Sequence, residues 1–342
     1  MTLELSIIVP AYNEAHRLTD GLKRFDAAVD DGCVDIEQTE VVVIDDGSSD
    51  ETAATARSLL AHLPHHRVVS LPSNQGKGAA VRTGIRLARG AATAYMDADM
   101  AIDPRAIPKL LDALGSREVA IGSRALTDSM VDGTYAVRAI MGRLFNRMVT
   151  TGTGLDLLDT QCGFKAFRAP VARLLFHLVR IDRFAFDVEL LARSKRLGLQ
   201  IAEVPVHWKN VPGSTIHPLH DSVSMLADVY RSRLGLMPAP RMQAVVVEDR
   251  ADPAGQELLC RTATVLARIL PDVPLPMLVA GSKVTALFPL VDPADSAMAT
   301  TALRAEFDTA HVHSRSLDLA GLTRLGPLGG RLLDSVAVAT EA

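Results

Sequence analysis

The stretch ATAYMDADMAID, residues 92–103, places two carboxylates, Asp97 and Asp99, directly after an apolar run. Such a run predicts a buried strand that delivers both acids to the end of a sheet, where open α/β sheets bind their ligands. Two carboxylates with an open side suit Mg²⁺ or Mn²⁺, because these ions share their ligands between protein oxygens and substrate phosphates. A lone Asp-x-Asp is frequent by chance, so the neighbouring segments decide its meaning.

Strand-like and helix-like segments alternate around this stretch. Apolar runs at 3–12, 40–48, 67–73, 91–100 and 118–124, the first two rich in Val and Ile, end in turn or polar residues, and apolar residues at helical spacing occupy 51–63 and 77–90. This alternation predicts an α/β fold with a mostly parallel sheet covered by helices on both faces. Amphipathic helices are expected at 134–154, 187–198 and 222–237, with a short strand at 200–208.

The segment PAPR at 238–241 has the composition of a linker. Beyond it, the predicted elements follow the order βαββαβ, which is typical of a small α+β ferredoxin-like domain. We therefore expect one domain at 1–237 and a second at 238–342. The second contains no paired carboxylates, no Gly-rich phosphate loop and no metal-ligand spacing, which favours a binding, homo-oligomerisation or regulatory role.

Composition restricts the class of protein. Hydrophobic residues make up 48% and charged residues 22% of the 342 residues, as in globular proteins. The formal net charge of −4 gives no general attraction to nucleic acid. Three cysteines without disulfide or metal spacing, and an amino terminus unlike a signal peptide, predict a cytoplasmic location. No apolar run reaches the roughly 18 residues of a membrane span.

Polar loops follow the other predicted strands. Pro10, Tyr12 and Glu14 belong to a turn with exposed backbone groups and a carboxylate, which would suit a nucleoside, although a plain strand–helix turn explains it too. Asp45 and Asp46 precede a glycine. One acid is expected to accept bonds from a base or ribose and the other to cap the next helix, while capping alone remains an equal alternative.

Three basic residues complete the predicted site. Lys77 lies among glycines near a helix amino terminus, a place that favours anions, although the spacing is not that of a P-loop. Arg124 follows the fifth strand, and Arg138 lies in the helix expected next. Arginine is well suited to bidentate phosphate contacts, but either arginine alone is more often an ordinary surface charge.

Taken together, these motifs resemble the inverting family 2 glycosyltransferases, and within them the polyprenyl-phosphate glycosyltransferases of the dolichyl-phosphate β-glucosyltransferase type. The resemblance spans about residues 3–235. It rests on SIIVPAYNE, VVVIDDGSSDET, LPSNQGKGAAVRTGIRLARG, DADM, AIGSR, DTQCGFKAFR, RFAFDVELLARSKRLGLQIAEVPVHW and PGSTIHPLHDSVSML. The carboxy-terminal unit lies outside it.

The resemblance implies a Rossmann-like sheet of the GT-A type that binds a nucleotide sugar, UDP-glucose above all, with Mg²⁺ or Mn²⁺. It implies nucleoside contacts from Pro10, Tyr12, Glu14 and Asp46, and metal and diphosphate binding by Asp97 and Asp99. Arg124 and Arg138 would face the phosphate of a lipid acceptor. The sugar and acceptor side would be lined by Asp159, Gln161, Lys165, Asp187 and Glu189.

Two departures from the family leave the acceptor open. Relatives usually carry a membrane anchor, which this sequence lacks, and His220 stands where a basic residue is common. The helices expected at 134–150 and 222–237 would permit peripheral contact with the inner face of a membrane. A soluble phosphorylated or hydroxyl acceptor is the alternative, and a non-catalytic sugar-nucleotide sensor is a third hypothesis.

The acceptor class decides whether a base is required. A lipid monophosphate has a second pKa of about 6 and is already anionic near neutral pH. A hydroxyl acceptor would need a carboxylate to take its proton, and Asp187 is the candidate. In both cases the metal at Asp97 and Asp99, helped by Lys77, would stabilise the departing diphosphate.

Overall fold

The computed structural model describes residues 3–133, 146–151, 153–211, 240–249, 254–271, 273–307, 312–329 and 331–335, with 225, 227, 228, 230, 231, 252, 338 and 339. Its larger sheet has the strand order β3-β2-β1-β4-β7-β5-β8. These strands are β1 (Leu5–Ala11), β2 (Thr39–Asp45), β3 (His66–Ser70), β4 (Ala92–Met96), β5 (Val119–Ser123), β7 (Phe164–Arg168) and β8 (Ile201–Pro205). The mostly parallel sheet predicted from the sequence is confirmed.

Strand β7 was not expected from the sequence, and it runs antiparallel to both of its neighbours, β4 and β5. Its first residue, Phe164, pairs with Met96 at the end of β4. Because β7 runs in the opposite direction, the loop that precedes it reaches the sheet edge where the parallel strands end. This brings residues 159–163 beside the Asp-x-Asp stretch.

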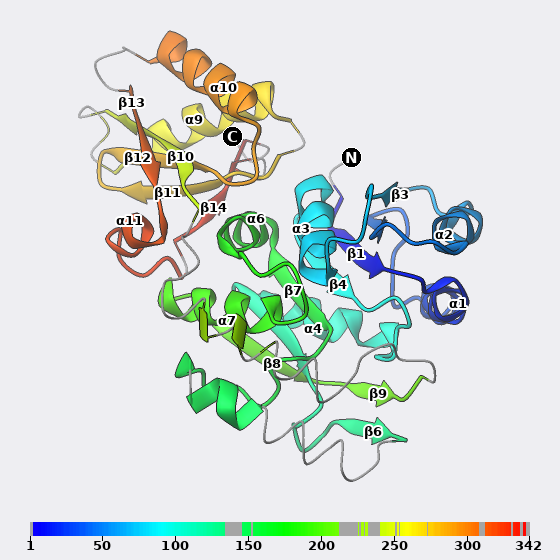
Figure 1. Cartoon of the computed structure of the whole chain (residues 1–342). Helices are drawn as coiled ribbons and strands as arrows, with labels where there is room; N and C mark the ends of the chain where they lie inside the picture. Colours follow the sequence, from blue (N-terminus) through cyan, green and yellow to red (C-terminus); the bar gives the residue numbers. More distant parts are fainter. Residues whose placement is uncertain are drawn as a thin grey trace.

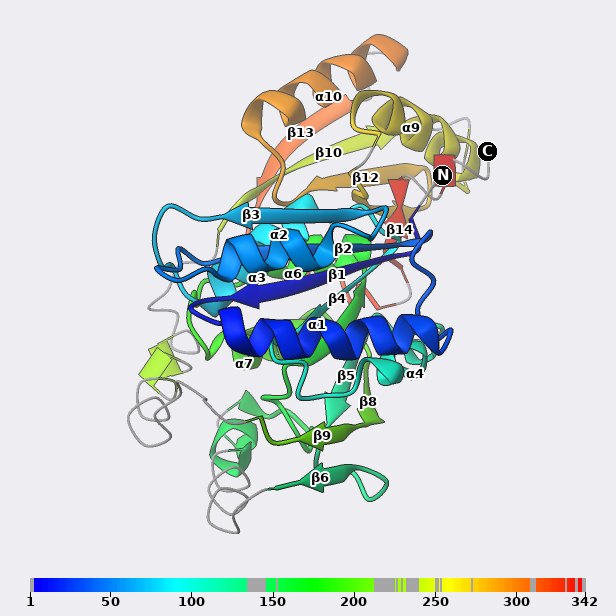
Figure 2. The ribbon, with the colours of Figure 1, turned by 90° about the vertical axis from the view of Figure 1, so that its right-hand side faces the viewer.

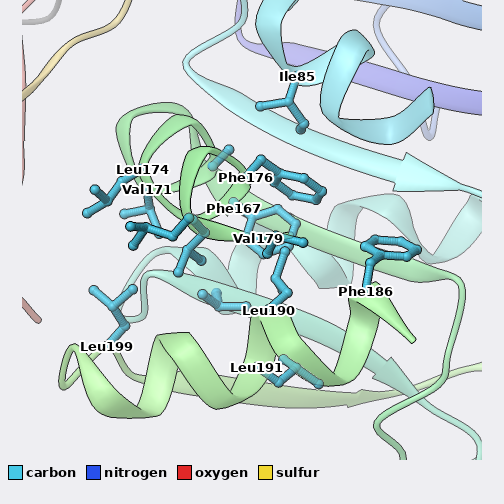
Figure 3. Packing of buried hydrophobic residues seen from close by; sticks show 14 of the residues in the cluster. Ile85, Phe167, Val171, Leu174, Phe176, Val179, Phe186, Leu190, Leu191 and Leu199 are labelled. Carbon is cyan, nitrogen blue, oxygen red and sulfur yellow. The ribbon is translucent and has the colours of Figure 1, made fainter. Parts of the chain in front are cut away.

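Helices cover both faces of this sheet (Figure 2). One apolar core lies under α1 (Ala15–Asp30), α2 (Thr52–Leu60) and α4 (Ile107–Leu114), which follows the short helix η1 (Pro104–Ala106). The other lies under α3 (Lys77–Leu87), α6 (Ala169–Leu178) and α7 (Phe186–Arg196). Figure 3 shows Phe167, Phe176 and Phe186 in this second core, where their rings pack with Tyr95.

The single strand expected at 200–208 is wrong in one respect. It divides at Val206 into β8 and β9 (His207–Lys209), and β9 pairs in parallel with β6 (Met130–Asp132) in a separate two-stranded sheet. Most residues of the helices expected at 134–154 and 222–237 lie outside the described residues; residues 146–151 are helical. Within the described ranges, no helix combines the length and apolarity needed to cross a bilayer.

The carboxy-terminal part forms an antiparallel sheet with the order β13-β10-β12-β11-β14. Its elements are β10 (Met242–Glu248), α9 (Gln256–Ile269), β11 (Pro276–Ala280), β12 (Lys283–Phe288), α10 (Pro293–Glu306), β13 (Val312–Leu317), α11 (Leu319–Thr323) and β14 (Leu333–Asp334). The βαββαβ order predicted from the sequence is confirmed, with α11 and β14 added. The domain limits at residues 237 and 238 remain predictions.

This antiparallel sheet is buried on both faces. Helices α9 and α10 cover the face turned away from α6, and the opposite face packs toward α6 (Figure 1). Met242, Leu278 and Leu287 on that second face belong to the same apolar core as α6. The carboxy-terminal part is therefore joined to the larger sheet through continuous apolar packing.

Candidate active site

Asp97 and Asp99 follow β4 and are each paired with a cation from another element. Lys77, the first residue of α3, places its Nζ 2.6 Å from Asp97 Oδ1. Arg17, in the first turn of α1, donates to Asp99 Oδ2 through Nη2. Asp97 keeps 44% of its side chain exposed, whereas Asp99 keeps 11%. The two acids therefore differ in access: Asp97 faces an open space and Asp99 lies beneath it.

The charges at this site are strongly coupled. Burial, followed by the nearby Asp97 carboxylate, raises the pKa of Asp99. Burial alone would lower the pKa of Lys77, but Asp97 and Asp187 raise it above its ordinary value. Burial raises the pKa of Glu14 to about 7, with Arg17 opposing and Asp99 and Asp97 adding to the rise. An additional cation would relieve this crowding of carboxylates.

The donor set suits a metal that is shared with a substrate. Asp97 and Asp99 offer hard oxygen ligands, and Asp97 is open to a bound molecule. Within the part of the chain that the structure describes, no three acid, histidine or cysteine side chains gather as a metal-binding group. Two carboxylates leave several positions of an octahedral ion to phosphate oxygens and water, the arrangement that Mg²⁺ favours.

The loop after β1 is tied to the loop after β2. Asn13 has a left-handed backbone conformation, with φ of 52°, and its Oδ1 accepts the backbone N–H of Ser49 at 2.9 Å. The backbone N–H of Glu14 donates to Thr52 Oγ1 at 2.9 Å. Tyr12 is 44% exposed, while Pro10 is buried inside β1. Tyr12 and Glu14 thus stand on a braced turn, and Arg17 joins Glu14 to Asp99.

Asp46 holds the loop that carries Lys77. Its two carboxylate oxygens accept the backbone N–H groups of Gln75 and Gly76, both at 2.8 Å, and the residue is 2% exposed. Gly76 has φ of 105°, and a Cβ there would lie 2.5 Å from the carbonyl oxygen of Asp182. Asp46 therefore fixes the loop that leads into α3.

Glu189 supports the same loop from the other side. It is 3% exposed, and its Oε2 accepts the backbone N–H groups of Arg180 and Ile181, both at 2.8 Å. Its Oε1 pairs with Arg193. The segment that it fixes continues to Asp182, whose carbonyl oxygen accepts the N–H of Ala79 at 3.1 Å. Glu189 thus supports the first turn of α3, which begins at Lys77, through residues 180–182.

Arg124 and Asp159 form a bidentate pair at the end of β5. Arg124 Nε donates to Asp159 Oδ2 at 2.7 Å and Nη2 donates to Oδ1 at 2.9 Å. Burial raises the pKa of Asp159, but the guanidinium outweighs it and holds that pKa below its ordinary value. Gln161 lies two residues further on, and its Nε2 is buried without a hydrogen-bond partner among the described residues. The pair keeps the guanidinium plane fixed.

Asp187 lies under the site with two donors on one oxygen. Lys165 Nζ donates to its Oδ1 at 2.5 Å, and the Tyr95 hydroxyl donates to the same atom. Lys165 is fully buried and Asp187 is 3% exposed. Burial, and then the Asp187 charge, raises the pKa of Tyr95 well above its ordinary value, so the phenol keeps its proton.

The fold therefore gathers most of the residues singled out in the sequence at one sheet edge. Arg138 and His220 lie outside the described residues. Three neighbours were missed. Arg17 and Tyr95 pair with acids of the site, and Gly163 lies so close to Asp97 that a Cβ would come within 2.1 Å of Oδ2. Only the position of Arg17, three residues beyond Glu14, offered a sequence signal.

A sequence profile described as glycosyl transferase family 2 matches residues 6–176, which contain the sheet edge and both acids. The chain belongs to this family. It is similar to dolichyl-phosphate beta-glucosyltransferase of Dictyostelium discoideum, with 37% identity over 243 residues, covering 67% of this chain and 73% of that protein. It is also 37% identical over 244 residues to the protein of the same name from Drosophila melanogaster, a match that covers 67% of this chain and 74% of that protein.

The fold has a solved counterpart in glucosyl-3-phosphoglycerate synthase from Mycobacterium tuberculosis. The match has a TM-score of 0.50 and 23% identity, and covers 70% of this chain and 81% of that one. At this identity the likeness establishes the shared GT-A fold. Family membership and fold together make the acids after β4 the candidate active site.

Proposed function

We propose that this family 2 enzyme moves glucose from UDP-glucose to a polyprenyl monophosphate with inversion, using Mg²⁺ or Mn²⁺ held by Asp97 and Asp99. The observation that carries the proposal is the meeting of these acids with Lys77 and Arg17 at the end of β4. The names of the relatives, dolichyl-phosphate beta-glucosyltransferases, support the sugar and the acceptor class. A lipid-linked acceptor would bring the chain to the inner face of a membrane.

The donor would lie along the loops of β1, β2 and β4. Tyr12 and Glu14 would contact the nucleoside, since they stand on the turn braced by Asn13. When bound, the metal would act as a Lewis acid on the diphosphate. Lys77 would add positive charge where the leaving group gains negative charge, and each 1.4 kcal/mol of such stabilisation corresponds to about tenfold in rate.

The surroundings of Asp187 favour a phosphate acceptor over a hydroxyl. A hydroxyl needs a base that is free to take its proton. Asp187 Oδ1 already accepts bonds from Tyr95 and Lys165, in a position that is 3% exposed. A phosphate monoester needs no base, and Arg124, fixed by Asp159, offers a rigid guanidinium for its oxygens. Asp159, Gln161 and Lys165 would thus shape the acceptor side.

The test compares acceptors on the native chain. Radiolabelled transfer from a panel of nucleotide sugars is measured to a short-chain polyprenyl phosphate, to the matching polyprenol and to a soluble sugar phosphate, with Mn²⁺ or with chelator. We expect transfer from UDP-glucose to the polyprenyl phosphate only, and only with Mn²⁺. Transfer to the polyprenol or to the soluble phosphate would assign another acceptor. Full activity in the presence of chelator would contradict the proposed dependence on a divalent metal. Comparing acceptors is cleaner than Asp187→Asn, which would leave buried Lys165 without its ion partner.

A further inference from the structure

Arg17 occupies an unusual position for a cation. It lies in the first turn of α1, where the helix dipole disfavours positive charge, and no acidic residue of that turn offsets it. Its partners are Glu14, the N-cap residue of the same helix, whose Oε1 accepts from Nη1 at 2.7 Å, and Asp99, whose Oδ2 accepts from Nη2. One guanidinium therefore bridges an acid on the nucleoside loop and an acid of the metal pair.

This bridge leaves Asp99 with both oxygens engaged. Oδ1 accepts the backbone N–H of Ala101 at 3.1 Å, and Oδ2 accepts Arg17. A divalent cation that binds Asp99 competes with the guanidinium for the same carboxylate. Arg17 is 18% exposed and Asp99 is 11% exposed, so the competition takes place with little screening by water.

A second place for Arg17 is already present on Glu14. Glu14 Oε2 and Arg17 Nε are both buried, and neither has a hydrogen-bond partner among the described residues. An unpaired acceptor and an unpaired donor on two groups that already touch are what a bidentate arginine–carboxylate pair would satisfy. If Arg17 gave up its bond to Asp99 and paired with both carboxylate oxygens of Glu14, the buried Nε and Oε2 would be satisfied and Asp99 Oδ2 would be free to bind a cation.

We propose that Arg17 is a positioning residue that exchanges partners, pairing with Asp99 when no divalent cation is bound and with Glu14 alone when one is. The inference rests on the metal site of the proposed function. Arg17 then neutralises Asp99 in the empty enzyme, as Lys77 neutralises Asp97, and sets the affinity for the cation. Glu14 contributes by receiving the displaced guanidinium.

The test measures Mn²⁺ binding directly, by the electron paramagnetic resonance signal of free Mn²⁺, without nucleotide or acceptor. Arg17→Met is expected to tighten binding by at least about tenfold, because Coulomb's law gives about this size for a single and a double charge about 5 Å apart in water and this site is less screened than water. Glu14→Gln is expected to weaken binding several-fold. In the double variant, the effect of Glu14→Gln should be clearly smaller than in the native background, because only the direct loss of a nearby negative charge remains and the guanidinium that Glu14 receives is absent.

A matched control removes the same charge from the same helix. Arg24 donates through Nη1 to the backbone carbonyls of Asp99 and Met100, at 2.9 and 3.2 Å, and to neither carboxylate of the metal pair. Arg24→Met should tighten binding by less than about threefold, as expected for a charge that contacts neither carboxylate of the metal pair. General damage to the loop would weaken binding, which separates it from the effect proposed for Arg17.

The outcomes separate this inference from the proposed function. Unchanged or weaker Mn²⁺ binding in Arg17→Met would overturn the exchange, and so would a Glu14→Gln effect of equal size in the native chain and in Arg17→Met. Either result can occur in an enzyme that still transfers glucose, so the proposed function would stand. If the variants show the expected Mn²⁺ affinities but the native chain transfers no glucose, the exchange is supported and only the proposed glucosyl transfer is overturned. A native chain that takes up no Mn²⁺, either alone or with UDP present, would overturn the metal site and the inference together.

Discussion

Gly163 shows how closely a single residue controls the acid pair. A Cβ at this position would lie 2.1 Å from Asp97 Oδ2 and 2.4 Å from its Cγ. The carboxylate is the far end of a rotatable side chain, so Gly163→Ala should turn Asp97 away and leave the fold intact. We expect Mn²⁺ affinity and transfer to fall by about 100-fold, the scale of an ångström-sized misplacement. Mn²⁺ titration and thermal unfolding check this.

Gly115→Ala is the matched control, because its Cβ would approach only the carbonyl oxygen of Asp112, at 3.1 Å. It should leave Mn²⁺ binding unchanged. Full Mn²⁺ affinity in Gly163→Ala would contradict the assignment of Asp97 as a metal ligand. An alanine variant that unfolds would instead show that the glycine serves the sheet edge as a whole.

Individual residues also mark the limit of what the sequence predicts. Asp97, Asp99 and Lys77 were predictable because each follows a strand or opens a helix whose apolar pattern is clear. The supporting role of Glu189 was not, since its partners are backbone N–H groups of a loop without periodicity. Arg17 has only a weak sequence signal, its place three residues beyond Glu14, because a lone arginine in a helix is usually a surface charge and only the fold brings it to Asp99.

At the scale of elements, the loop that precedes α3 and the loop at residues 180–182 together hold the amino-terminal end of α3 in place. Glu189→Gln removes the charge that pairs with Arg193, which is only 7% exposed, and weakens the acceptor for two backbone N–H groups. Breaking a buried ion pair by removing one partner costs about 3 kcal/mol of unfolding free energy. Looser packing of residues 180–182 on the loop of Lys77 should also raise the KM for the donor.

Urea unfolding and donor kinetics measure the two effects of Glu189→Gln. Glu306→Gln provides the control, because Glu306 pairs with Arg261 on the surface, where both side chains are about 40% exposed. Such a pair contributes less than about 1 kcal/mol. If Glu189→Gln loses no more stability than Glu306→Gln, the support described for α3 is wrong.

Strand β7 explains why part of the larger sheet escaped prediction. Its sequence, FKAFR, is short and contains Lys165, which argues against a buried strand. The lysine is tolerated because α7 brings Asp187 to it from 22 residues further along the chain. The carboxy-terminal elements were predictable because each has its own periodicity, but their packing against α6 depends on contacts between distant residues.

At the scale of the whole molecule, His177 on α6 joins the two sheets. Its Nε2 lies 3.1 Å from the carbonyl oxygen of Arg241, to which it donates, and its Nδ1 accepts the backbone N–H of Leu290 at 3.2 Å. Both partners belong to the carboxy-terminal part. These two bonds fix the neutral tautomer, because a proton on Nδ1 would meet the N–H of Leu290.

His177 should therefore make stability depend on pH. Burial lowers its pKa, and the charges of Arg180 and Arg82 lower it further, against the effect of the Arg241 carbonyl. The unfolded chain, with a histidine pKa of about 6.5, binds the proton more readily. Stability is thus intact above about pH 6.5 and is lost as the pH falls toward the lowered folded-state pKa.

The expected result is a steeper loss of unfolding free energy between pH 7 and pH 5 in the native chain than in His177→Gln. Urea unfolding at pH 7, 6 and 5 measures it, and His16→Gln, at an exposed position, should keep the native slope. Because the carboxy-terminal sheet and α6 share one apolar core, the loss should appear in a single cooperative transition. Equal slopes in the native chain and His177→Gln would mean that this histidine does not couple the two sheets to pH.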